Sequence, residues 1–122
     1  GVVGTASQAA SVPFYCREDF WMSSLDPDDG SYTHVAETPF LAWGDLLDTY
    51  KPTVFTLDIE GGELDIFSTV ERMDGIRCIV AEFHPKVYGS RGLTKALASI
   101  RELGFTEVPG QSGAVVRAFV KS

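Results

Sequence analysis

The sequence predicts an α/β fold whose central strands are mainly parallel and whose C-terminus forms an antiparallel hairpin. From about residue 43, short apolar runs alternate with amphipathic stretches, which is typical of strands and helices that alternate along the chain. Near the C-terminus, two further apolar runs flank a turn-rich connector at residues 109–113, as in a hairpin. The length of 122 residues indicates a single domain, with a strand and loop region over 1–42 and an α/β core over 43–122.

The first 42 residues differ from the rest and contain a loop at 24–31 that is rich in Asp, Pro and Gly. Three short strands are expected around this loop, at residues 2–3, 12–16 and 33–37. A helix is predicted over 43–50, ended by Pro52, because four apolar side chains recur there at helical spacing: Trp43, Leu46, Leu47 and Tyr50.

The core is expected to contain four strands, at residues 53–58, 77–83, 105–108 and 114–120. Strand 77–83 is nearly continuous in apolar residues, as expected for a strand covered on both faces, so we place it at the centre of the sheet. Helices are predicted over 63–73, with Gly75 as the C-terminal cap, and from about Leu93 to a cap at Gly104. Residues 84–92 are expected to form a glycine-containing loop.

The composition excludes several classes of protein. Hydrophobic residues make up 44% and charged residues 22% of the chain, which is ordinary for a globular protein. The formal net charge of −7 argues against a nucleic-acid partner, because phosphate binding needs clustered Lys and Arg. No apolar run is long enough to span a membrane, and no signal peptide is recognisable. We therefore expect a cytoplasmic protein in which Cys16 and Cys78 are reduced.

Acidic residues and a histidine follow two of the predicted strands. Asp58 and Glu60 are two residues apart, as are Glu82 and His84, so each pair projects to one side of its strand. If the strands are parallel neighbours, all four side chains gather at their carboxyl ends, where open α/β sheets bind ligands. Because closely spaced carboxylates are costly without a proton, a cation or a ligand, this grouping favours a functional site.

Three residues between the strands extend this site. Glu63, in the first turn of the following helix, is expected to join the acidic group. Gly61 and Gly62 carry no side chains, which lets a ligand approach the backbone closely.

The run DIEGGE at residues 58–63, followed by AEFH at residues 81–84, resembles the signature of FkbM-type methyltransferases. Its core reads Asp-x-Glu-Gly-x-Glu, and a later strand ends in Glu and often His. Three other runs are similar to that family: VPFY at 12–15, SSL at 23–25 and LLD at 46–48.

The resemblance implies a Rossmann-like sheet and the transfer of a methyl group from S-adenosylmethionine to a hydroxyl of a sugar or small metabolite. It makes Asp58, Glu60, Glu63 and His84 the expected catalytic residues, with His84 as the preferred base and Asp58 as the second choice. Gly61, Gly62 and Glu82 are expected beside the substrate or cofactor. The glycine-rich cofactor turn and the ribose-binding acid of such sheets are not recognisable, so we expect an incomplete sheet that corresponds to the C-terminal part of the enzyme.

Two other functions remain open at this point. Asp58, Glu60, Glu82 and His84 also suit Mg²⁺ or Mn²⁺, which would make the protein a metal-dependent hydrolase or transferase. Alternatively, the chain is a non-catalytic interaction module that pairs a sheet edge with a partner or with itself.

In an incomplete sheet, strand 53–58 needs a cover, which we expect to come from the strands at 12–16 or 33–37, from a second copy, or from an upstream segment.

Overall fold

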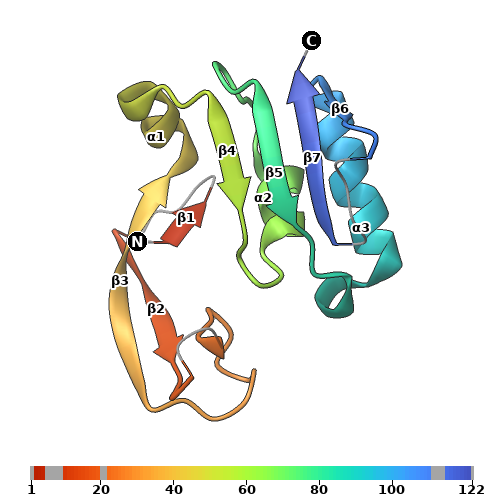
Figure 1. Cartoon of the computed structure of the whole chain (residues 1–122). Coiled ribbons are helices and arrows are strands. Elements are labelled where there is room, and N and C mark those ends of the chain that lie inside the picture. Colours follow the sequence, from red (N-terminus) through yellow and green to blue (C-terminus); the bar gives the residue numbers. More distant parts are fainter. Residues whose placement is uncertain (1, 5–9, 20–21, 111–114, 122) are drawn as a thin grey trace. The chain divides into compact units, whose positions relative to one another are not determined.

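In the computed structural model of the chain, residues 2–4, 10–19, 22–110 and 115–121 are described (Figure 1). The chain divides into two compact units, an N-terminal unit of residues Gly1–Trp43 and a C-terminal unit of residues Gly44–Ser122. This division falls next to the boundary that the sequence predicts between the strand and loop region and the α/β core.

The N-terminal unit is built on a three-stranded sheet with the order β1-β3-β2. Its strands are β1 (Val2–Gly4), β2 (Ser11–Cys16) and β3 (His34–Ala42), so the three predicted strands are confirmed, and β3 is longer than expected. β1 pairs with β3 in parallel, whereas β2 pairs with β3 in antiparallel register. β2 and β3 therefore pair with each other, and a cover for the strand at 53–58 stays a prediction.

A buried arginine organises the loop that follows β2. The guanidinium of Arg17 donates to the backbone carbonyls of Tyr15, Met22 and Asp26 at 3.0–3.2 Å, and to the hydroxyl of Ser24 at 3.1 Å. These contacts tie the loop to the end of β2, as does the paired hydrogen bonding of Tyr15 with Ser24.

The C-terminal unit contains a four-stranded sheet with the order β4-β5-β7-β6. The strands are β4 (Val54–Leu57), β5 (Cys78–Glu82), β6 (Phe105–Glu107) and β7 (Val116–Lys121). β4 and β5 are parallel, and β7 is antiparallel to both β5 and β6, so β4, β5 and β6 all run in one direction (Figure 1). The α/β class, the central position of β5 and the C-terminal hairpin are confirmed.

β4 is less buried than the sequence suggested. It is the outermost strand in the sheet order, and within the described ranges β5 is its only strand partner. Leu57 is buried, but Val54 is exposed, because side chains alternate between the two faces of a strand and these two residues lie on opposite faces.

Of the three helices in the described residues, α1 (Trp43–Tyr50) matches the prediction. Leu47 is buried on its inner face, whereas Tyr50, which was expected there, is exposed. α2 (Glu63–Thr69) ends four residues earlier than predicted, because Val70 adopts an extended backbone with ψ of 124°. Val70 is still buried, so the apolar pattern that predicted a longer helix reflects packing of an extended segment.

The predicted loop at 84–92 is wrong, because α3 (Pro85–Glu102) already begins at Pro85. Proline suits the first turn of a helix, where its missing N–H has no partner to lose. Gly89 then interrupts the helix with φ of 73° and ψ of 175°, a conformation open mainly to glycine. One helical turn therefore stands between β5 and the long part of α3. At the other end, the backbone N–H of Gly104 bonds to Arg101 as the predicted cap requires.

An aromatic core lies between the sheet and the pair of helices α2 and α3, which are behind the sheet in the view of Figure 1. The Phe67 ring of α2 contacts Phe55 of β4 and Phe83 after β5, and Phe83 contacts Phe119 of β7. Both cysteines are free. Among the described residues, no helix combines the length and the apolar character that crossing a bilayer requires.

Candidate functional site

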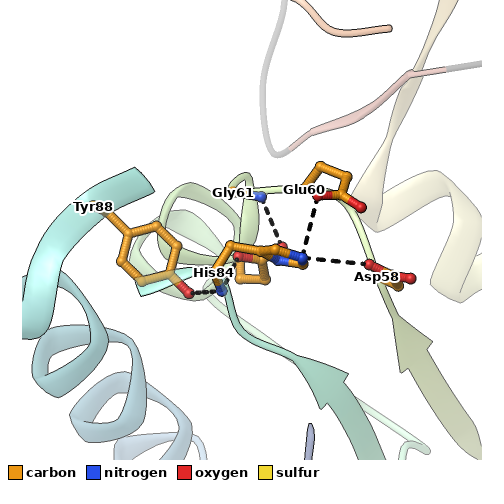
Figure 2. Close-up of polar contacts among 6 residues, drawn as sticks. Asp58, Glu60, Gly61, His84 and Tyr88 are labelled. Carbon is orange, nitrogen blue, oxygen red and sulfur yellow. Dashed lines mark hydrogen bonds and ion pairs between the residues drawn. The ribbon is translucent and has the colours of Figure 1, made fainter. Parts of the chain in front are cut away.

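The carboxyl ends of β4 and β5 carry a cluster of three carboxylates around one imidazole, the Glu63–His84 cluster. The parallel register aligns Leu57 with Ala81, so the residues that follow the two strands emerge at the same edge. Figure 2 shows the His84 ring between Tyr88 on one side and Asp58 and Glu60 on the other. The structure therefore brings together the four residues that were expected to be catalytic: Asp58, Glu60, Glu63 and His84.

Glu63 is the buried member of the cluster, with a fully inaccessible side chain. Its Oε1 atom accepts from the backbone N–H of Gly61 at 3.0 Å and lies 3.0 Å from Nδ1 of His84. Its Oε2 atom accepts from the backbone N–H of His84 at 3.4 Å. A buried carboxylate needs such donors, because removing it from water is otherwise costly. The motif loop supplies one of them, and His84, at the start of α3, supplies the others.

The second ring nitrogen of His84 faces the two exposed carboxylates. Nε2 lies 3.3 Å from Oε2 of Glu60 and 3.9 Å from Oδ1 of Asp58. The Asp58 and Glu60 side chains are 58% and 61% exposed, against 18% for His84. The imidazole thus connects a buried carboxylate to a solvent-accessible acidic edge.

The motif loop is held in a conformation that depends on its sequence. Glu60 has a φ of 51° and Gly61 a φ of 111°, both in the left-handed region. A Cβ atom on Gly61 would lie 2.8 Å from a methyl carbon of Val87 in the first turn of α3. The loop and that turn are in such close contact that glycine at 61 is required by both backbone and space. Gly61 and Gly62 lie beside the cluster, as the sequence predicts, but whether a ligand approaches them stays a prediction.

Glu82 takes no part in the cluster as far as the described residues show. It ends β5 opposite Val116 of β7, and the group of potential ligand atoms at this edge consists of Asp58, Glu60 and His84. The spacing of two residues predicts that Glu82 and His84 project to the same side of their strand. That spacing fails here because β5 ends at Glu82, and the backbone of His84 (φ −113°, ψ 67°) already turns into α3.

Tyr88 is a member of the site that the sequence argument missed. Its hydroxyl accepts from the backbone N–H of His84 at 2.8 Å. The pKa of Tyr88 is raised from 10.0 to about 12, chiefly by burial and also by the nearby Glu63 carboxylate, while the hydrogen bond from His84 acts in the opposite direction. The phenol is therefore protonated at neutral pH and able to donate to Glu63. Its position four residues after His84, with Pro85 starting a helix between them, is the signal that could have identified it.

This arrangement supports two kinds of chemistry. A neutral His84 ring that donates from Nδ1 to the Glu63 carboxylate keeps a lone pair on Nε2 for a proton or a cation. One ligand atom each from Asp58, Glu60 and His84 lie within 4.8 Å of one another, close enough to share an ion.

Comparisons of the chain with protein-family models, with curated proteins and with solved structures find no match. The geometry of the cluster and the sequence motif at residues 58–63 are therefore the observations that bear on function.

Proposed function

We propose that the Glu63–His84 cluster is the proton-accepting side of an O-methyltransferase site that acts on a hydroxyl of a sugar or small metabolite. The observation that carries this proposal is the hydrogen bond between Glu63 and Nδ1 of His84, which directs Nε2 toward the accessible edge of the sheet, 3.3 Å from the Glu60 carboxylate. The resemblance of residues 58–63 and 81–84 to the FkbM-type motif supplies the reaction class. The parallel β4–β5 pair and the antiparallel C-terminal hairpin agree with the sheet that this class implies.

The chemical role of the cluster is to take one proton. The proton of the acceptor hydroxyl would move to Nε2 of His84 while the electron pair of the O–H bond stays on oxygen. S-adenosylmethionine, when bound, would supply the methyl group, and its sulfur would keep the electron pair of the broken carbon–sulfur bond. The imidazolium that results is flanked by the carboxylates of Glu60 and Asp58 on one side and Glu63 on the other, which stabilise its positive charge. Glu63 also fixes the ring orientation, so that the base is aligned before the acceptor arrives.

The described residues do not provide a complete pocket for S-adenosylmethionine. In sheets of this kind, the cofactor is held by a glycine-rich turn after a strand that neighbours the motif strand, and by an acidic residue after the next one. The sheet described here has β4 as its outermost strand, and β1, which contains Gly4, pairs with β3 in the other unit. No step is therefore assigned to the cofactor. We expect the 122-residue chain alone to bind it weakly or not at all in titration calorimetry, and micromolar affinity would contradict this.

The proposal is tested by methyl transfer from labelled S-adenosylmethionine, at millimolar concentration to offset weak binding, to a panel of sugars and small polyols. We expect a methylated hydroxyl product from the wild-type chain and none from His84→Gln. His34→Gln is the matched control, because His34 is the second of the two histidines and lies in the N-terminal unit. If the wild-type chain methylates no hydroxyl acceptor, or if His84→Gln keeps full activity, the proposal is wrong.

A second candidate function, a divalent-metal site, is favoured by the three ligand atoms of Asp58, Glu60 and His84 that lie within 4.8 Å of one another. Glu63 would then orient the histidine ligand through Nδ1, as carboxylates behind metal-bound histidines do. Oxygen and imidazole ligands suit Mn²⁺ or Mg²⁺ in a metal-assisted transferase or hydrolase.

Thermal denaturation with added Mn²⁺ tests this candidate, since an ion that binds the folded state raises the melting temperature. We expect stabilisation of the wild type and of Asp65→Asn, an exposed acid on α2, but not of Glu60→Gln. Equal stabilisation of all three proteins would place the ion elsewhere, and none at all would eliminate the metal site.

A further inference from the structure

Tyr88 contacts the backbone of the central histidine of the cluster. Its hydroxyl lies behind the His84 ring, on the side away from Asp58 and Glu60 (Figure 2). It accepts the backbone N–H of His84 at 2.8 Å, and the same N–H lies 3.4 Å from Oε2 of Glu63. The phenol and the buried carboxylate therefore share one backbone donor.

The structure makes room for the Tyr88 ring at one residue of α3. A Cβ atom on Gly92 would lie 2.8 Å from Cδ2 of the ring and 2.9 Å from the Cβ of Tyr88. The same Cβ would lie 3.1 Å from Leu64 of α2, so α2 also packs closely against α3 at Gly92. Gly89, which interrupts α3, lets the turn that carries Tyr88 depart from the axis of the rest of the helix.

We propose that Tyr88 is a positioning residue that keeps the proton of the neutral His84 ring on Nδ1, so that the lone pair stays on Nε2. Its catalytic meaning depends on the function proposed above, but its effect on the histidine does not. With the phenol present, the His84 N–H has a strong acceptor, so the Glu63 carboxylate stays directed at Nδ1 and at the Gly61 N–H. Without it, Oε2 of Glu63 becomes the sole remaining acceptor at hydrogen-bond distance for that N–H among the described residues. The carboxylate is then drawn away from the ring, and Nδ1 loses part of its preference for the proton.

The test is the tautomer of His84 in the ¹⁵N-histidine-labelled chain, read from long-range proton–nitrogen correlations that show which ring nitrogen carries the proton. We expect wild-type His84 to carry it on Nδ1. Tyr88→Phe, which removes only the hydroxyl, should shift the ratio of the two tautomers by about two- to tenfold toward Nε2–H, the effect of one net hydrogen bond. Gly92→Ala keeps the phenol but displaces its ring, and should shift the ratio in the same direction.

Two controls are built into the chain. His34 is the second histidine and reports any general effect of the substitutions, so its signals should not move. Tyr50→Phe removes a hydroxyl from a side chain that is 74% exposed and should leave the His84 tautomer unchanged. An unaltered tautomer ratio in folded Tyr88→Phe would overturn the proposal and reduce Tyr88 to a packing residue.

The methyl-transfer assay separates this inference from the proposed function. If both hold, Tyr88→Phe lowers kcat with little change in KM, because the hydroxyl acts on the base and not on the acceptor. If the tautomer shifts but the wild-type chain transfers no methyl group, the positioning role stands and the proposed reaction is wrong. If methyl transfer is observed but the tautomer ratio of Tyr88→Phe is unshifted, the proposed reaction stands and the positioning role is wrong.

Discussion

The two units of the chain are stabilised in different ways. In the C-terminal unit, fourteen of the fifteen buried hydrophobic side chains in the described ranges lie between Leu47 and Phe119, and they pack two helices against a sheet. In the N-terminal unit, the described side chains that are buried are those of Arg17 and Trp43, and the two terminal nitrogens of the Arg17 guanidinium donate to backbone carbonyls and a hydroxyl. One unit depends on apolar packing and the other on strand pairing and a hydrogen-bonded arginine.

This difference indicates where a precise site can be built. A carboxylate and an imidazole stay in register only if the elements that carry them are rigid. Glu63 is on a helix whose next turn includes Ile66 and Phe67, both buried in the aromatic core, and His84 directly follows Phe83 of the same core. The apolar packing of the C-terminal unit therefore holds the residues of the cluster in place.

The largest loss of stability is expected for Phe67→Ala, at about 3–5 kcal/mol, because the side chain is 1% exposed and its removal leaves a cavity. Val35→Ala in the N-terminal unit, at a side chain that is 44% exposed, should change stability by no more than about 0.5 kcal/mol. Denaturant midpoints measure both. Equal shifts would mean that α2 does not anchor the core and that the contrast between the units is wrong.

Asp58→Asn should separate function from packing within the C-terminal unit. The substitution conserves shape, removes one charge beside Nε2 of His84, and affects an exposed side chain, so the fold should be intact. Methyl transfer should fall by about a hundredfold or more, the usual contribution of a proton-transfer group and its electrostatic support. Wild-type turnover of Asp58→Asn with the true acceptor would remove Asp58 from the site.

Arg17→Met should loosen the N-terminal unit alone. It removes the guanidinium donor from the carbonyls of Met22 and Asp26, of which only Asp26 keeps a second donor among the described residues, the Ser24 hydroxyl at 3.3 Å, and the local cost is about 1–3 kcal/mol. Amide hydrogen exchange measures this unit by unit: the Ser24 amide should exchange faster, whereas the Ile79 amide in β5 should keep its protection. Faster exchange at Ile79 would show that the two units unfold together.

The smallest effect is a pH dependence at Tyr88. The folded state raises the pKa of this phenol from 10.0 to about 12, so the folded protein holds the proton more tightly than the unfolded chain. The associated stabilisation is complete below pH 10 and is lost as the pH rises through 12. As the pH rises across this range, the unfolding free energy of the wild type should therefore fall relative to that of Tyr88→Phe. A constant difference would mean that the Tyr88 hydroxyl is solvated.

The sequence predicted the site better than it predicted the elements around it. Strand ends follow from apolar runs, and parallel neighbours bring their ends together, which is why Asp58, Glu60 and His84 meet. The distinct position of Glu63 was not predictable from the motif, because its burial depends in part on donors of His84, which is 21 residues away in sequence. Tyr88 was missed because Gly89 and Gly92 indicated a loop, whereas in the structure one permits a kink and the other makes room for a ring.

The position of β7 also has a consequence for how the C-terminal unit is made. Among the described strands, β5 and β6 are connected in the sheet only through β7, which is synthesised after both of them. During translation, the apolar edge of β5 and the buried face that later receives Phe119 are therefore exposed until residue 121 has left the ribosome. A chain arrested before residue 116 should be cleaved rapidly by proteases and bind chaperones that recognise unpaired strands. Pulse proteolysis of stalled chains of increasing length should show protection appearing abruptly once β7 has emerged.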